Sequence, residues 1–450
     1  MFKIIFLIVS LSLTTQQVFS QSPSWHTLPG APNTDTMAPL RFDDIYFINS
    51  FTGWVIKGDR YYVTNDTGAV YRTTNGGTNW QMVNNQIVNY LRSTGFFNEN
   101  IGIIGAIGDS LHTLYRTTDG GFTWADIMPN IQGIAPKGIC GISIVNSSTA
   151  YACGRYYCPA NVIKTTNAGL NWISIPVDTS MVRSLVDCHF WSDDSGFVVG
   201  GYAPNNLYGT GKSVILFTSN GGTSWVRVYQ SARVNEWCWK IQFVNRLLGF
   251  TSIERFGTPT FILKTTNGGM NWIEISLPGN ITNLEGIGFV NEQTGWVGGW
   301  GYTYYEPSYK TTNGGANWSL AGWGINMNRI RFISDTLAYA VGTTVYKYTR
   351  EPIGIHQIST EIPKEFILHQ NYPNPFNPVT KIEFEVQKSS FVTIKVYDVL
   401  GKEITTVANE NLTAGIYSVI WDAYNFPSGI YFYKIIASEF TESKKMILIK

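Results

Sequence analysis

The chain has little charge, and neither sign is in excess. Charged residues make up 14% of its 450 residues, with 32 Lys and Arg against 31 Asp and Glu. Proteins that bind nucleic acids or anionic membrane surfaces present a marked excess of positive charge. The composition therefore gives no electrostatic case for either partner, and we expect no nucleic-acid ligand.

Long apolar runs are also scarce. Crossing a bilayer takes about 20 apolar residues, and only the short run IIFLIVSLSL at residues 4–13 approaches that character. This run follows Lys3 and precedes the small Ser20, which is the order of a secretory signal peptide. We therefore predict a signal peptide at residues 1–20, export through the Sec pathway and no membrane-spanning segment.

Cysteine is rare as well: Cys140, Cys153, Cys158, Cys188 and Cys238 are the five present. Since none precedes Cys140, a lipid anchor on an N-terminal cysteine is excluded. An odd number leaves at least one thiol without an intramolecular partner, and the sequence does not say which cysteines pair. There is no CxxC pair, and the five histidines are scattered. We therefore expect no metal site and no cofactor.

What the sequence has in abundance is aromatic residues (14%) and glycine (44 residues), which suit short strands joined by tight turns. A phrase close to YRTTNGGTNW recurs six times, and each copy ends in tryptophan. These tryptophans are Trp80, Trp124, Trp172, Trp225, Trp272 and Trp318, at intervals of 44, 48, 53, 47 and 46 residues. A period of this length with strand-like runs inside it indicates the blades of a β-propeller.

A second motif, an apolar strand ending near Phe and followed by a turn and Gly or Ala with an aromatic or Ile, occurs seven times. Its copies are YFINSFTGWVIKG, FFNENIGIIG, ISIVNSSTAYACG, HFWSDDSGFVVGG, QFVNRLLGFTSI, GFVNEQTGWVGG and RFISDTLAYAVG. The last copy has no tryptophan phrase after it, but the N-terminal SWHTLPG resembles NWISIPV, the fourth strand of a blade. We therefore predict an all-β chain whose residues 21–348 form a seven-bladed propeller, closed by the strand around Trp25, and we expect a monomer.

The recurrent phrase has the chemistry of a self-contained turn. Its third position is Asn or Asp, whose side chains bond to nearby backbone, and its glycines supply positive φ without steric cost. The residues at that position are Asn75, Asp119, Asn167, Asn220, Asn267 and Asn313. A turn that satisfies its own polar groups has little left for a ligand, so we interpret the six copies as structural joints with the tryptophan buried between blades.

The phrase resembles the Asp-box, also called the BNR repeat, of sialidase-type and sortilin-type propellers and of the photosystem II assembly-factor family. The last is the most similar, because it pairs a GW-V-G strand with a T-x-GG-x-W turn, seen here as Gly53-Trp54 with Gly76-Gly77-x-x-Trp80. The resemblance covers residues 24 to about 350 and implies the fold rather than an activity. Five of the six boxes carry Asn in place of the acid, and only Asp119 keeps it.

The composition changes at Phe366, where Asn-Pro and Pro-Phe turns lead into alternating strands of a small β-sandwich. The order NYPNPFNP, VYD-x-x-G, G-x-Y-x-x-x-WDA, PSGIYFY closely resembles the C-terminal sorting domain of the type IX secretion system in Bacteroidetes-like bacteria. This implies that residues 366–450 address the protein to that machinery, for display on the cell surface or release. Residues 349–365 are the expected linker.

One face of the predicted propeller gathers the unusual residues. The loops between second and third strands and the starts of blades lie on the face opposite the box turns, and they are rich in Tyr, Trp and Arg, as binding surfaces often are. The candidate ligand-binding residues are Arg60, Tyr61, Tyr62, Arg155, Tyr156, Tyr157, Trp237, Trp239, Trp300, Tyr302, Tyr304 and Tyr305. They predict binding of a glycan or a protein; the alternative is that these aromatics fill the central funnel.

No catalytic motif stands out, and we expect a non-catalytic protein with no catalytic residues. The alternative is a secreted glycoside hydrolase on the same fold, either sialidase-like or with paired carboxylates. For that alternative the raw material is Arg41, Arg183 and Arg329 with Glu236, Glu285, Asp43, Asp44 and Asp187. These arginines do not fall at matched positions of the repeat, so no role is carried over from the sialidases.

Overall fold

The computed structural model describes residues 22–449 except 29, 35–40, 59–66, 109–111, 155–159, 204–209, 256, 279–280, 282, 302–305, 351–354 and 424–425. Within these residues the secondary structure is β apart from one 3-10 turn, η1 (Met128–Asn130). None of the described residues belongs to a helix long and apolar enough to cross a membrane. The all-β prediction is confirmed.

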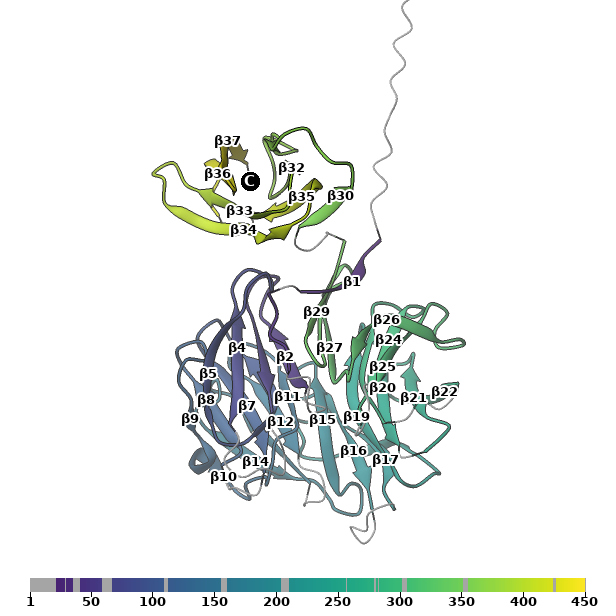
Figure 1. Cartoon of the computed structure of the whole chain (residues 1–450). Coiled ribbons are helices and arrows are strands. Elements are labelled where there is room, and N and C mark those ends of the chain that lie inside the picture. Colours follow the sequence, from purple (N-terminus) through teal and green to yellow (C-terminus); the bar gives the residue numbers. More distant parts are fainter. Residues whose placement is uncertain are drawn as a thin grey trace, which may run out of the picture.

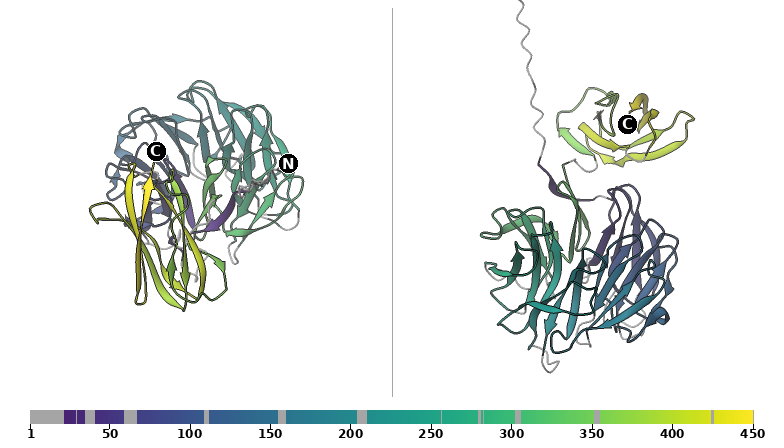
Figure 2. Two further views of the ribbon diagram at one scale, coloured as in Figure 1. Left: turned by 90° about the horizontal axis from the view of Figure 1, so that it is seen from above. Right: turned by 180° about the vertical axis from the view of Figure 1, so that it is seen from behind.

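Seven sheets of four or five strands follow one another around a ring in the described chain, as the colours show in the front and rear views (Figure 1; Figure 2, right). In each, the first strand is innermost and contacts the first strands of both neighbouring sheets. The inner strands are β2 (Phe42–Phe47), β6 (Tyr90–Phe96), β11 (Gly141–Ile144), β15 (Ser184–Phe190), β19 (Glu236–Phe243), β23 (Leu284–Phe289) and β27 (Arg329–Ser334). Because β27 also contacts β2, the ring closes and the predicted seven-bladed propeller is confirmed.

The second and third strands complete the middle of each blade by antiparallel pairing. They are β3 (Gly53–Lys57), β4 (Gly68–Thr73), β7 (Gly102–Ile107), β8 (Leu114–Thr117), β12 (Ala150–Gly154), β13 (Asn161–Thr165), β16 (Gly196–Tyr202), β17 (Lys212–Thr218), β20 (Gly249–Arg255), β21 (Phe261–Thr265), β24 (Gly295–Gly299), β25 (Pro307–Thr311), β28 (Leu337–Val341) and β29 (Val345–Thr349).

The outer strands differ at two places. Most are simple fourth strands: β5 (Gln81–Ile87), β9 (Ala125–Asp126), β14 (Trp172–Pro176), β18 (Val226–Gln230), β22 (Ile273–Ser276) and β26 (Ser319–Ile325). In the third blade β10 (Ile131–Gln132) adds a fifth strand parallel to β14. In the seventh blade the outer strand is β1 (Ser24–Thr27), which pairs with β29 and so confirms the predicted closure by the N-terminal strand.

Aromatic stacking between blades explains the second sequence motif. The aromatic residue of a second strand stacks on the Phe that ends the inner strand of the next blade, as Trp54 does on Phe96 with ring centroids 3.5 Å apart. Tyr339 stacks on Phe47 across the ring closure at 3.6 Å. The tryptophan of the recurrent phrase then packs edge-on, as Trp80 does against Phe47. The two motifs are therefore parts of one blade-to-blade contact.

The recurrent turns share one hydrogen-bond pattern. In the first, Thr73 Oγ1 donates to Asn75 Oδ1 (3.0 Å), the Gly77 N–H donates to Thr73 Oγ1 (3.0 Å), and the Asn79 N–H donates to Asn75 Oδ1 (2.9 Å). Gly77 has a φ of 86°, which favours glycine. The same bonds recur around Asp119, Asn167, Asn220, Asn267 and Asn313. In each turn the Asn or Asp side chain is thus engaged in hydrogen bonds within the turn itself.

The C-terminal part forms two four-stranded sheets with one shared core, the predicted β-sandwich. Its alternating strands bury every second residue, for example Ile382 and Phe384 on β32. The strands are β30 (His356–Ser359), β31 (Ile367–Leu368), β32 (Val379–Val386), β33 (Ser390–Tyr397), β34 (Glu403–Leu412), β35 (Gly415–Asp422), β36 (Gly429–Ala437) and β37 (Phe440–Leu448). Since β30 pairs with β35, part of the expected linker joins the sandwich as an edge strand.

Candidate functional site

Of the twelve candidate ligand-binding residues, three lie within the described part of the chain. The other nine lie outside it: Arg60, Tyr61, Tyr62, Arg155, Tyr156, Tyr157, Tyr302, Tyr304 and Tyr305. Trp237 is 1% exposed and packs closely against Gly201 and Gly211 of the preceding blade, and Trp239 is buried too. These two tryptophans therefore fill space inside the ring and offer no surface to a ligand here, while Trp300 is half-buried.

Trp300 packs against Arg41, a buried arginine that precedes the innermost strand of the first blade. The Arg41 guanidinium lies 4.3 Å from the centroid of the Trp300 ring, which is a cation–π distance. Arg41 is held in turn by ion pairs with Asp43 and Glu285. The Trp300 side chain is thus a fixed aromatic surface, because the guanidinium that packs on it is held in place by two ion pairs. We call this part of the channel the Trp300 end.

Charged side chains from the inner strands meet inside the channel. β-Bulges place them there: the pairing register of inner strands shifts around Asp43, Arg92, Trp239–Lys240 and Glu285. A bulge leaves an extra residue that breaks the in–out alternation of a strand. This is why the adjacent residues Asp43 and Asp44 both reach charges in the channel.

Asp44 is the most heavily paired of these acids. It accepts hydrogen bonds from Arg329 Nε (3.0 Å), from Arg331 Nη2 (3.2 Å) and from the Thr94 N–H (3.1 Å). Burial alone would raise the pKa of this carboxyl, but Arg329 and Arg331 lower it to about 2. Asp44 is therefore ionised at any physiological pH and is occupied by its partners.

Arg329 spans the channel between two blades. Its Nη1 and Nη2 donate to the two oxygens of Asp187 at 2.8 and 3.0 Å, the fork geometry that a carboxylate matches best. Its Nε is bound to Asp44, as described above. Arg329 thus lies near two of the acids named with it, but as a structural clamp: the sequence placed it at the start of a blade and missed that each of its three nitrogens binds one of these carboxylates.

At the Trp300 end, Asp43 pairs with Arg41 and Arg92, and Glu285 pairs with Arg41. Glu254 of β20 is the acid left over, and its Oε2 has no hydrogen-bond partner among the described residues. Burial and the neighbouring Glu285 raise the pKa of Glu254 to about 8, so this carboxyl holds a proton at neutral pH. Glu236, another candidate acid, is tied to Arg233 (3.0 Å) and Ser213 (2.9 Å). Arg183, the remaining candidate arginine, starts the fourth blade at the same face.

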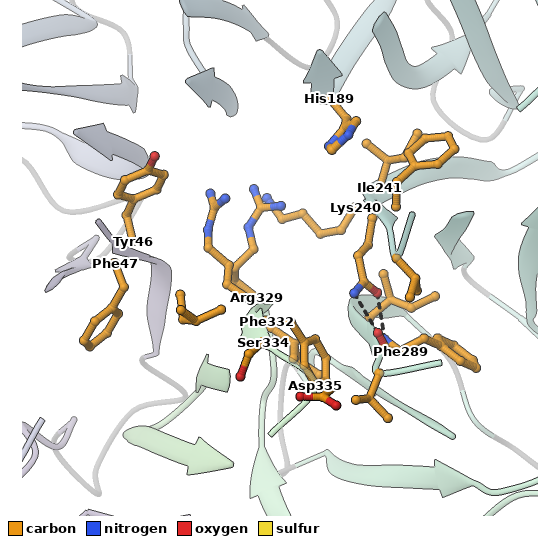
Figure 3. Close-up of a pocket in the computed structure, with 18 residues that line it drawn as sticks. Tyr46, Phe47, His189, Lys240, Ile241, Phe289, Arg329, Phe332, Ser334 and Asp335 are labelled. Atoms are coloured by element: carbon orange, nitrogen blue, oxygen red, sulfur yellow. Dashed lines mark hydrogen bonds between the residues drawn. The ribbon is translucent and has the colours of Figure 1, made fainter. Parts of the chain in front are cut away.

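A cavity of about 460 Å³ lies at the other end of the channel, between the last residues of the inner strands (Figure 3). Arg329 and Arg331 of β27 line it with Lys240 of β19. In Figure 3 the side chains of Arg329 and Lys240 extend toward each other across its centre, and His189 and Tyr46 lie on opposite sides. This Lys240 end opens on the side of the recurrent turns, opposite the face that the sequence favours for binding.

Lys240 is the residue of the channel that sequence reasoning missed most clearly. Its side chain is 1% exposed, and its Nζ has no hydrogen-bond partner among the described residues. Burial and the positive charge of Arg329 lower its pKa to about 8. The available signal was a lysine within the largely apolar run WCWKIQF, because charged residues are rarely buried.

The four described cysteines are all buried: Cys140, Cys153, Cys188 and Cys238. Cys153 and Cys188 lie within hydrogen-bond reach of one another, and burial raises the pKa of Cys153 well above its usual value. Its thiol is therefore protonated and unreactive. Among the described residues no group of His, Cys, Asp and Glu is arranged to hold a metal ion.

The C-terminal residues 370–450 match the family model of the secretion system C-terminal sorting domain. The tail is a sorting domain. This confirms the tail predicted from sequence, with the match beginning a few residues after Phe366, and it indicates export to the cell surface or beyond it. No curated protein matches the chain.

Solved structures resemble the chain at low identity. A YCF48 protein bound to a D1 peptide shares 16% identity over 73% of this chain and 96% of its own, with a TM-score of 0.46. An ancestral GH74 enzyme shares 14% over 93% and 60%, with a TM-score of 0.49. The Trypanosoma rangeli sialidase in complex with sialic acid shares 8% over 94% and 89%, with a TM-score of 0.38. All three scores are below 0.5, so the fold rests on the sheets themselves and no activity is transferred.

Proposed function

We propose that this chain is an exported, non-catalytic β-propeller that binds a glycan or a protein at the Trp300 end. In this proposal a signal peptide directs the Sec step, and the type IX secretion machinery of a Bacteroidetes-like bacterium recognises the sorting domain. The six recurrent turns are Asp-boxes that join strands and take no part in binding. Support for these roles comes from the tail and from the turns' internal hydrogen bonds.

The observation that carries the binding proposal is the pairing of Trp300 with Arg41. The aromatic ring is half-buried, and the guanidinium 4.3 Å from its centroid is anchored by Asp43 and Glu285. A fixed aromatic ring costs little entropy when a sugar ring or a peptide side chain stacks on it. It therefore has the properties of an anchor residue at the centre of a binding surface.

The pairing of the channel acids favours binding over hydrolysis. A retaining or inverting hydrolase needs two carboxyl groups free to act on the substrate. Asp43, Asp44 and Asp187 are each bound to arginine inside the ring. They are therefore committed to holding the blades together.

One observation favours the alternative of a glycoside hydrolase. Glu254 and Glu285 are neighbours in different surroundings: burial and the charge of Glu285 raise the pKa of Glu254, which takes up a proton, while Arg41 pairs with Glu285. Such a pair resembles the division between a general acid and a carboxylate that serves as base or nucleophile. This second candidate function assigns the acid role to Glu254 and the other role to Glu285.

One experiment separates the two functions. The purified mature protein is tested on a panel of polysaccharides, with binding and release of reducing sugar scored together. We expect binding without release, and Trp300→Ala weakens it about tenfold or more. The matched control is Phe122→Ala, an exposed aromatic on the recurrent turns. Sugar release that disappears in Glu254→Gln would overturn the non-catalytic proposal, and equal loss of binding in both aromatic variants would overturn the site.

The export proposal is tested separately in a host that has the type IX machinery. The intact chain is expected at the cell surface or in the medium. A variant without residues 370–450 is expected to stay in the periplasm, because the remaining propeller lacks the sorting domain that the secretion machinery recognises. Export of that variant at the normal level would contradict the role assigned to the tail.

A further inference from the structure

Lys240 presents an unmatched positive charge to an open cavity. Its ammonium group is buried, lines the cavity of about 460 Å³, and has no hydrogen-bond partner among the described residues. A buried cation without a partner is costly in water-excluded surroundings. Its position at a cavity of ligand size, rather than in close packing, indicates that a partner from outside completes its environment.

The charges around Lys240 leave an excess of one cation. Arg329 and Arg331 on β27 face Asp44 on β2 and Asp187 on β15, and each of these acids is bound to an arginine. Arg92 on β6 adds further positive charge near Lys240 and is itself paired with Asp43. The acids within the channel are therefore used up before Lys240 is neutralised.

Two further groups at the cavity can donate hydrogen bonds. Arg331 uses Nε and Nη2 for Asp44, which leaves Nη1 available, and its side chain is 25% exposed. His189 Nε2 has no partner among the described residues. Burial lowers the pKa of His189 to about 4, so the ring is neutral and carries a single N–H. Hydrogen-bond donors thus lie on more than one side of the cavity. Asp335 also lines the cavity, but it is exposed to solvent.

We propose that this cavity binds a small molecule through an oxyanion, a carboxylate or a phosphate group, with the Lys240 ammonium as its principal partner. An oxyanion supplies acceptors for the three ammonium hydrogens and for the spare donor of Arg331. The Tyr46 ring on the opposite side of the cavity gives the remainder of the molecule an apolar surface. This site is distinct from the Trp300 end and does not depend on the ligand bound there.

The test measures the melting temperature and heat of binding of the full-length mature protein with three probes. These are inorganic phosphate, D-galacturonate and, as a neutral control, D-galactose, all at constant ionic strength. We expect phosphate or galacturonate to bind and raise the melting temperature, since a ligand that binds only the folded state stabilises it. The two probes distinguish a phosphate from a carboxylate ligand, and failure of both to bind would overturn the proposal.

Lys240→Met is the decisive variant, because it keeps the length of the side chain and removes only the charge. We expect it to fold and to bind the probe at least about tenfold more weakly, the effect of one charge-assisted hydrogen bond. Lys137→Met, at an exposed lysine elsewhere, is the matched control. Unchanged binding in Lys240→Met would place the anion elsewhere and overturn the proposal. If Lys240→Met fails to fold, Arg331→Gln provides the same comparison.

The pH dependence gives an independent readout. Lys240 attracts an oxyanion only while it is charged, so the affinity for D-galacturonate, whose carboxylate stays ionised throughout, is expected to be full at pH 6.5 and to fall as the pH rises through about 8. The neighbouring Asp44, Asp187 and Arg329 stay charged and His189 stays neutral across this range. A flat profile between pH 6.5 and 9.5 would contradict a role for Lys240. Trp300→Ala should leave the affinity for these probes unchanged, which separates this site from the proposed function.

Discussion

The Trp300 end and the Lys240 end of the channel contain the same kinds of charged residue in opposite balance. At the Trp300 end Arg41 and Arg92 face three acids, and Glu254 is left without a cation. At the Lys240 end Asp44 and Asp187 face three cations, and Lys240 is left without an acid. Burial favours the neutral form of both unpaired groups: it raises the pKa of Glu254 to about 8 and lowers the pKa of Lys240 to about 8.

The difference between the ends lies in what covers the surplus group. Glu254 takes up a proton inside the ring, near arginines that lie under the rings of Trp239 and Trp300. Lys240 lines a cavity open to solvent, where an anion can neutralise it. The unpaired acid Glu254 is therefore neutralised by a proton, whereas the unpaired cation Lys240 can be neutralised by a ligand that enters the cavity.

The largest effect is expected from removing the cation that two acids share. Arg329→Met leaves Asp44 and Asp187 buried with too little positive charge, which should lower the free energy of unfolding by about 3–5 kcal/mol. Urea unfolding followed by tryptophan fluorescence measures it. Arg331→Met is the control: Arg331 is 25% exposed, and Asp44 keeps Arg329 as a partner, so its loss should be smaller. An equal loss of unfolding free energy in both variants would contradict the expectation that the buried ion pairs of Arg329 contribute more than those of the more exposed Arg331.

Removing the surplus cation should have the opposite sign. Lys240→Met is expected to raise the free energy of unfolding at pH 7 by about 2 kcal/mol, because it removes a buried charge that has no partner. The folded-state pKa of Lys240 is lowered from 10.5 to about 8, so its cost is full below pH 8 and is relieved as the pH rises toward 10.5. The advantage of the variant should therefore fade over that interval. Destabilisation at pH 7 would place Lys240 within the paired network.

The surplus acid should produce a slope at lower pH. The folded-state pKa of Glu254 is raised from 4.5 to about 8, so the folded protein binds the extra proton and loses stability as the pH rises between these values. We expect a slope on the order of 1 kcal/mol per pH unit between pH 5.5 and 7.5. Glu254→Gln should flatten it, whereas Glu99→Gln, at an exposed acid, should not. A slope that survives in Glu254→Gln would assign it to another group.

The smallest effect is expected in the recurrent turns, which depend on local bonds rather than on the channel. Asn75→Ala removes the acceptor of the Thr73 hydroxyl and of the Asn79 N–H, at a cost of about 1 kcal/mol. Asn79→Ala in the same turn keeps these bonds, because Asn79 contributes its backbone N–H. Thermal unfolding of the two variants makes the comparison. Equal stability would contradict the role of the Asn75 side chain.

The sequence predicts those structural features that depend on residues close together in the chain. The turn from Thr73 to Trp80 closes on itself, so its residue types suffice to identify it and to count the blades. The pairing of β1 with β29 was also predictable, because the strand at Trp25 repeats the pattern of the other outer strands. The sorting domain was recognised in the same way, from short motifs in a fixed order.

The sequence could not predict the channel in the same way. Regular alternation would send Asp43 and Asp44 to opposite faces of β2, but a bulge brings both to the channel. Their partners Asn328 and Arg329 are 285 residues away along the chain, and no local pattern records that distance. The binding residues proposed from sequence included Trp237, whose ring is buried against glycine backbone. Composition alone does not separate a buried aromatic from an exposed one.

The sequence by itself therefore determined the seven blades, their joints, the closing strand and the address for export, because each depends on contacts between near neighbours or on a repeated pattern. Only the tertiary structure decided which charges are neutralised and which are left over. That outcome depends on distances between side chains from five or more blades, and on whether each one faces a ring, a partner or a cavity. Lys240 is set apart from the other channel cations because its nearest acids, Asp44 and Asp187, are already bound to arginine, which is a property of the closed ring.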